Sequence, residues 1–166
     1  RQRQMCIRDR STSVWNDTNP TSTVFSVGTN SRINGNTETY VSYCFAEVEG
    51  YSKFGSYTGN GVTSGDGTFV FLGLRPSFVM IKNTNSGEWV MVDSVRSTFN
   101  EVDDILNAND TTREADFGTT NRNIDFLSNG FKIKSTASGG TTALNSSGNT
   151  YIYMAFAEAP LSLIHI

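Results

Sequence analysis

Short apolar runs with a two-residue period, each ended by glycine, proline or asparagine, recur along this 166-residue chain. The clearest run is residues 151–158 (YIYMAFAE), in which Ile152, Met154 and Phe156 alternate with tyrosine and alanine. A period of two places successive side chains on opposite faces of a β-strand. Because both faces of this run are apolar, we expect a central strand that is covered on both sides.

The composition indicates the same class of fold. The chain holds 20 Thr, 19 Ser, 16 Asn and 15 Gly, and aromatic residues make up 11% of it. Threonine and aromatic residues favour strands, whereas Asn, Ser and Gly favour turns, and helix-forming residues are scarce. We therefore predict an all-β fold with little helix, an antiparallel β-sandwich of the lectin or jelly-roll type.

Other strands are predicted from shorter runs at residues 68–72, 78–82, 89–93, 124–127 and 131–134. Pro76 ends the ladder between the first two because proline has no N–H to donate. Gly87 and the Ser-Asn-Gly sequence at 128–130 are expected to turn two hairpins. Only residues 99–106 have the composition of a short helix.

The chain contains an internal repeat. Residues 40–47 (YVSYCFAE) match residues 151–158 at an offset of 111 residues, with Tyr40, Phe45, Ala46 and Glu47 identical to their counterparts. A period of this length corresponds to a domain and is too long for a solenoid unit. We therefore expect residues 11–49 to be the C-terminal part of a preceding repeat and residues 50–160 to be a complete β-sandwich repeat.

The two ends of the chain are predicted to be artefacts. Codons for Met5–Arg10 (ATG TGT ATA AGA GAC AG) and for Leu161–Ile166 (CTG TCT CTT ATA CAC AT) can be reverse complements of each other. One inverted DNA sequence then encodes both ends, and it resembles a transposon-end sequencing adaptor. We expect residues 1–10 and 161–166 to be adaptor-derived, and such segments are set aside before fold reasoning. The alternative for residues 1–10 is a basic arm that binds nucleic acid.

Setting the ends aside changes the charge. Nine basic and fifteen acidic residues remain, a net charge of −6, and the only histidine, His165, is removed together with Cys6. An acidic body with scattered Lys and Arg predicts no binding to nucleic acid or anionic membranes. No apolar run approaches the roughly 18–20 residues that span a bilayer, so no membrane insertion is expected. Cys44, left alone, allows no internal disulfide.

The residue types do not favour catalysis. Without a histidine, a serine-type triad is not available. Paired carboxylates serve glycosidases, but we interpret the carboxylates here as solvated surface groups; the candidates are Asp93, Glu101, Asp103, Asp104, Asp116 and Asp125. The oxygen-rich stretch 107–110 lacks the spacing of a calcium loop. The sequence therefore predicts no catalytic residues, no metal site and no cofactor.

Several motifs carry a family resemblance. They are GLRPSFVMIKN (73–83), DSVR (93–96), FLSNGFKI (126–133), NSSGNTYIYMAFAE (145–158) and the stretch YCFAEVEGYSKFGSYTGNG (43–61). On these motifs the chain resembles a domain of unknown function that occurs in tandem in tail-fibre and other virion proteins of tailed phages and is abundant in marine metagenomes. Leu74 stands where that family has an aromatic residue. The resemblance implies a fold and a virion context, with no catalytic residues to transfer.

The function implied by this resemblance is a non-enzymatic structural, receptor-binding or glycan-binding module in the virion, outside the host cell. Its expected partners are other tail proteins and host cell-surface glycans. Sugars stack on aromatic faces that have polar neighbours, and Trp89, Tyr57 and Tyr51 lie among Asn, Ser and Gly. These three are the candidate binding residues, with ordinary sheet packing as the alternative for each. Two other functions stay open, a virion-associated carbohydrate-active enzyme and a bacterial surface adhesin, and homo-oligomerisation is left open too.

The adaptor interpretation predicts that both ends are dispensable. Deleting residues 1–10 and 161–166 together is expected to leave the melting temperature unchanged within error, because neither segment belongs to the folded domain. Differential scanning calorimetry of the full and shortened chains checks this. A loss of several degrees would show that the ends contribute packing.

Overall fold

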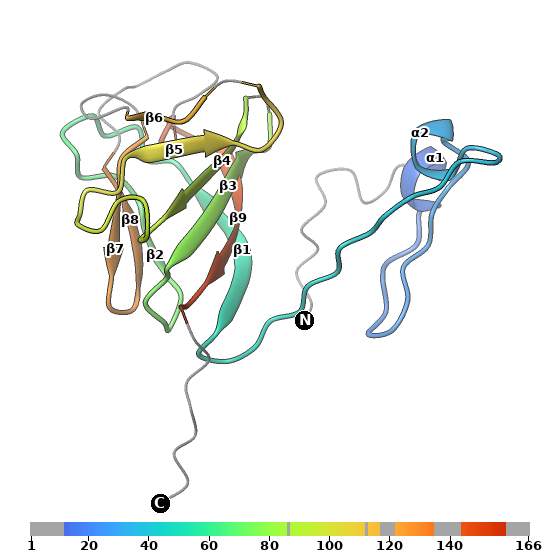
Figure 1. Cartoon of the computed structure of the whole chain (residues 1–166), viewed down its shortest axis with the longest axis horizontal. Helices are drawn as coiled ribbons and strands as arrows, with labels where there is room; N and C mark the ends of the chain where they lie inside the picture. The colour runs from blue at the N-terminus through green and yellow to red at the C-terminus, as the bar shows by residue number, and fades with distance from the viewer. Residues whose placement is uncertain (1–11, 86, 112, 117–121, 135–143, 159–166) are drawn as a thin grey trace, which may run out of the picture. The chain divides into compact units, whose positions relative to one another are not determined.

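The computed structural model describes residues 12–158 apart from residues 86, 112, 117–121 and 135–143 (Figure 1). Both segments predicted to be artefacts, 1–10 and 161–166, lie outside the described residues. The chain divides into two compact units, one ending at Phe45 and the other beginning at Ala46. No helix in the described part of the chain is long and apolar enough to cross a membrane.

The described part of the N-terminal unit is built from two helices of one turn each, α1 (Thr12–Trp15) and α2 (Ser31–Asn34), joined by a loop. Asn30 caps α2, since its Oδ1 accepts a hydrogen bond from the backbone N–H of Arg32 at 2.9 Å. The rings of Trp15 and Phe25 pack edge to face, with their centroids 6.4 Å apart. After the turn at 36–37 the chain runs on to residue 47 without any strand pairing among the described residues.

The second unit contains two antiparallel sheets (Figure 1). The larger sheet has six strands, in the order β1 (Ser52–Thr58), β9 (Thr150–Phe156), β3 (Phe78–Asn83), β4 (Trp89–Asp93), β5 (Asp104–Asn107) and β6 (Ala115–Asp116). The smaller sheet has the order β2 (Phe69–Phe71), β8 (Gly130–Ile133) and β7 (Ile124–Leu127). The prediction of an all-β antiparallel sandwich is confirmed.

The core lies between the two sheets. Val79, Ile81 and Val92 from the larger sheet and Phe126 and Phe131 from the smaller sheet are all almost completely buried. Burying apolar area of this kind is the main favourable contribution to folding, at about 25 cal/mol per Å².

An aromatic cluster joins the sheets. The ring of Phe131, on β8, lies edge-on to Tyr57 and Tyr153 at centroid distances of 6.1 and 5.5 Å. Tyr57 also stacks on Tyr151 at 4.9 Å with an interplanar angle of 10°. Its buried hydroxyl donates a hydrogen bond to the carbonyl of Leu144 at 2.8 Å. The cluster therefore fixes how β1 and β9 pack on the smaller sheet.

The two predicted hairpins are confirmed. Residues 78–82 pair with 89–93 in β3 and β4, and residues 124–127 pair with β8 around the turn at 128–129. The central position of β9 is confirmed too, because it pairs with β1 on one side and β3 on the other. Its outer face is only partly covered, however, since Ile152 is buried but Met154 and Phe156 are half-buried.

The predicted helix at 99–106 is wrong. Residues 104–107 form β5, whose Asn107 and Leu106 lie opposite Val90 and Met91 of β4. The β-branched Ile105 is buried there, so sheet pairing and burial outweigh a weak helix propensity.

Strand β1 was not predicted, because Gly55 and the serines interrupt its apolar pattern. The interruption has a structural reason: a Cβ at Gly55 would lie 2.7 Å from the hydroxyl of Tyr153. Glycine leaves the room that this tyrosine fills.

The aromatic cluster generates a stability prediction. Tyr57→Phe is expected to lower the free energy of unfolding by about 1–2 kcal/mol, because the carbonyl of Leu144 loses its buried donor. Tyr43→Phe is the matched control, since Tyr43 is 82% exposed. Urea denaturation measures both variants, and equal stabilities would contradict this role of the hydroxyl.

Candidate functional site

A row of apolar side chains crosses the larger sheet on the face opposite to the core. Strand pairing places Phe54 of β1, Met154 of β9, Met80 of β3, Met91 of β4 and Leu106 of β5 side by side. All five are half-buried. Opposite residues on neighbouring strands have Cβ atoms only about 4.5–5.5 Å apart, so these residues, here called the apolar row, form a continuous strip.

Aromatic residues extend this face at the end where the chain enters and leaves the sandwich. The ring of Phe156 lies 6.0 Å from Tyr51, 5.8 Å from Phe54 and 6.2 Å from Phe78. At this end Ser52 lies opposite Phe156, and the N–H of Ala157 donates to the carbonyl of Tyr51 at 2.8 Å. Tyr51 is therefore packed against the outer face and is half-buried.

Trp89 lies at the opposite end of the same face, next to Lys82 on β3. Its backbone N–H donates to Oδ1 of Asn109 at 2.7 Å, and Nδ2 of Asn109 donates to Oε2 of Glu88 at 2.6 Å. Nζ of Lys82 donates to the carbonyl of Gly87 at 2.7 Å. These four residues, Trp89, Lys82, Glu88 and Asn109, form what we call the Trp89 corner. The corner combines a half-buried indole with an ammonium, a carboxylate and an amide.

The three residues predicted to bind sugar do not form one site. Tyr57 is only 7% exposed and belongs to the core, where burial and the neighbouring Tyr151 raise its pKa well above its usual range. Tyr51 and Trp89 share the outer face but lie at its two ends. Trp89 is half-buried, and its backbone N–H binds Asn109, whose side chain also binds Glu88.

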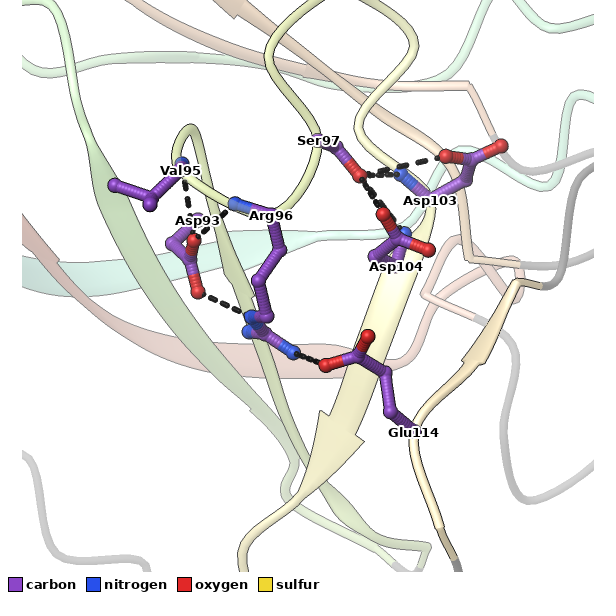
Figure 2. A network of polar contacts seen from close by, with 7 residues as sticks. All are labelled: Asp93, Val95, Arg96, Ser97, Asp103, Asp104 and Glu114. Atoms are coloured by element: carbon purple, nitrogen blue, oxygen red, sulfur yellow. Dashed lines mark hydrogen bonds and ion pairs between the residues drawn. The ribbon is translucent and has the colours of Figure 1, made fainter.

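A polar network occupies the loop after β4 (Figure 2). Nε of Arg96 contacts Oδ2 of Asp93 at 2.5 Å, and its NH1 contacts Oε2 of Glu114 at 3.0 Å. The backbone N–H groups of Val95 and Arg96 both donate to Oδ1 of Asp93. Asp93 thus accepts hydrogen bonds at both oxygens and holds the loop in a tight turn.

Two further carboxylates meet one serine in the same network (Figure 2). The hydroxyl of Ser97 donates to Asp104 at 3.0 Å and lies 3.5 Å from Oδ1 of Asp103, and it accepts the backbone N–H of each aspartate. Partial burial acts to raise the pKa of Asp93, but the hydrogen bonds and charge of Arg96 outweigh it and hold that pKa below its usual value. These carboxylates are engaged in stabilising a loop.

The other predicted carboxylates lie apart from this network. Oε2 of Glu101 accepts a hydrogen bond from Asn123 at 2.5 Å, and Asp125 lies opposite Lys132 on the smaller sheet. Partial burial raises the pKa of Asp125 against the lowering effect of Lys134. The side chain of Asp116 is outside the described residues. Among the described residues no three His, Cys, Asp or Glu side chains gather as a metal site.

The apolar row was missed by sequence reasoning. Its side chains alternate along each strand with residues of the other face, a pattern that also suits a strand covered on both faces. The available signal was the clustering of three of the four methionines in predicted strands, at Met80, Met91 and Met154.

A comparison with protein families places residues 6–160 in a family described as a domain of unknown function, DUF7483. The chain belongs to the DUF7483 family. A search of curated proteins and a search of solved structures each find no match. The DUF7483 match crosses the boundary between the two compact units and covers most of each.

The Asp93 network generates a pH-dependent prediction. A carboxyl whose pKa is lowered by folding stabilises the native state above its unfolded pKa, and this stability is lost as the pH falls through the folded pKa. Asp93→Asn is therefore expected to cost about 1 kcal/mol at pH 7 and progressively less below pH 4. Urea denaturation at a series of pH values measures this, with the exposed Glu49→Gln as the control. A pH-independent cost would contradict the ion-pair interpretation.

Proposed function

We propose that this DUF7483 chain is a non-enzymatic module of a phage tail fibre or another virion protein, and that it binds host-surface glycans at the Trp89 corner. The observation that carries the proposal is the half-buried Trp89, which lies opposite Lys82 and whose backbone N–H binds Asn109, itself hydrogen-bonded to Glu88. Indole faces stack on the C–H surfaces of sugars, and amide and charged groups beside the ring bind hydroxyls.

The placement of the corner supports this role. The paired ends of β1 and β9 bring the chain in and out of the sandwich at one end of the larger sheet. Trp89 lies opposite Lys82, four residue pairs along the strands from Phe78, and therefore toward the other end. A module that is tethered at one end presents its opposite end to a surface.

The state of the carboxylates favours binding over hydrolysis. A glycosidase needs one carboxyl that is free to protonate the leaving oxygen and a second on the other side of the bond. Asp93 is held by Arg96, and Asp103 and Asp104 both meet Ser97. These groups already have the partners that their loop requires.

The test is a glycan array probed with the wild-type chain, Trp89→Ala and Trp89→Phe. We expect the wild type to bind, Trp89→Ala to lose binding by tenfold or more (about 1.4 kcal/mol), and Trp89→Phe to keep part of it because a ring remains. The matched control is Phe71→Ala, which removes an aromatic ring that is 65% exposed on the smaller sheet.

Melting temperatures separate binding from folding in this test. A wild type that binds no glycan, or a Trp89→Ala variant that binds normally, would overturn the proposal. A Trp89→Ala variant that unfolds would assign the indole to structural packing and leave Trp89→Phe as the informative variant.

A further inference from the structure

Strand β9 occupies a slot between β1 and β3 in the larger sheet. It pairs with β1 from Thr150 to Phe156 and with β3 from Tyr151 to Phe156. Because β1 has no other neighbour in this sheet among the described strands, β9 is what pairs β1 to the larger sheet. Any strand that fills this slot must be small where Ala155 lies, since that residue is fully buried between Lys53 and Val79.

The turn before residue 40 reproduces the turn before β9, which is 111 residues later. The backbone N–H of Gly35 donates to the hydroxyl of Tyr40 at 2.8 Å, and the N–H of Ser146 donates to the hydroxyl of Tyr151 at 3.0 Å.

Two further features of the turn recur at the same offset. The N–H of Glu38 donates to Gly35, as that of Asn149 donates to Ser146. Thr37 has a φ of 67° and its counterpart Gly148 a φ of 73°. A threonine rarely adopts this left-handed conformation, so the agreement reflects a shared turn and not only a shared sequence.

The residues after the turn suit the slot position by position. Tyr40, Ser42 and Cys44 correspond to the inward-facing Tyr151, Tyr153 and Ala155, so a small side chain falls where the slot is tightest. On the other face, Val41, Tyr43 and Phe45 correspond to Ile152, Met154 and Phe156, which lie on the outer face with the apolar row.

In this chain the segment is left without strand pairing. Val41 is 76% exposed, Tyr43 82% and Phe45 58%. An exposed segment that belongs to no sheet and carries apolar side chains can add a strand to another sheet.

The turn at residues 48–52 opposes insertion of residues 40–47 into the β9 slot of the same chain. Val48 lies opposite Ser52, and the hydroxyl of Ser52 donates to the carbonyl of Ala46 at 2.9 Å. The β9 register would require Phe45 opposite Ser52, a shift of three residues. An odd shift turns every side chain to the other face of the sheet.

We propose that residues 40–47 are a preformed closing strand that displaces β9 from its slot in a second copy of this sandwich. The two copies are thereby joined by backbone pairing along both edges of the inserted strand. This inference is independent of glycan binding at the Trp89 corner.

Disulfide trapping between two full-length variants tests the proposal. The donor carries Cys6→Ser, which leaves Cys44 as its only thiol. The acceptor carries Cys6→Ser, Cys44→Ser and Val79→Cys, with Ala155→Glu to weaken its own β9, because a carboxylate does not fit a fully buried site. The two are mixed under a mild oxidant, and the donor–acceptor disulfide is identified by peptide mass.

The register determines the expected result. The N–H of Thr84 donates to the carbonyl of Thr150, so these two residues form a hydrogen-bonded pair. Hydrogen-bonded and non-hydrogen-bonded pairs alternate along antiparallel strands. Val79 and Ala155 lie an odd number of pairs away and therefore form a non-hydrogen-bonded pair. Such pairs have Cα atoms about 4.5 Å apart, within the range of disulfides. With Cys44 in the place of Ala155, we expect it to link to the thiol of the Val79→Cys acceptor.

A second donor, with Cys6→Ser, Cys44→Ser and Tyr43→Cys, is the matched control. Its thiol is exposed in the free chain but belongs to the outer face in the slot, so the link is expected to be lost. An acceptor that keeps Ala155 covers the case in which Ala155→Glu prevents folding, and the same preference is expected there at lower yield. Equal linking by the two donors, or no link from the Cys44 donor to either acceptor, would overturn the proposal.

Discussion

The pairing of β9 with β1 and β3 is the interaction on which the rest of the sandwich depends. Thr150–Phe156 is the last strand in the described part of the chain and lies beside the first strand of the sandwich, Ser52–Thr58, so the fold closes only when these two strands meet. The same strand contributes Tyr151 and Tyr153 to the aromatic cluster that joins the two sheets. Bringing together segments so distant in sequence costs conformational entropy. Burial of the core offsets this cost.

This closure also determines what each face of the larger sheet can do. Side chains alternate along β9, so the face that places Tyr151 and Ala155 in the core necessarily places Met154 and Phe156 outside. The outer face is apolar in its middle, aromatic near Phe156 and polar at Trp89. A strand in the β9 slot thus contributes both to the core and to the surface that remains open to partners.

The charged residues have mostly local tasks. Arg96 joins Asp93 to Glu114, and Ser97 joins the loop to Asp103 and Asp104 on the way into β5. These contacts stabilise the long connection between β4 and β5, part of which lies in the range 99–106 where the sequence predicts a helix. These engaged carboxylates are one basis of the proposed non-catalytic role.

The sequence by itself determined the class of the fold, the two hairpins and the central place of residues 151–156, because each rests on local alternation and on turn residues such as Gly87. It also determined that residues 40–47 repeat residues 151–158. Only the tertiary structure decided that Tyr57 is buried while Trp89 is half-buried, since alternation defines two faces without saying which of them packs on the second sheet. The same holds for β1, whose glycine makes sense only once Tyr153 lies against it, and for β5, where pairing with β4 outweighed helix propensity.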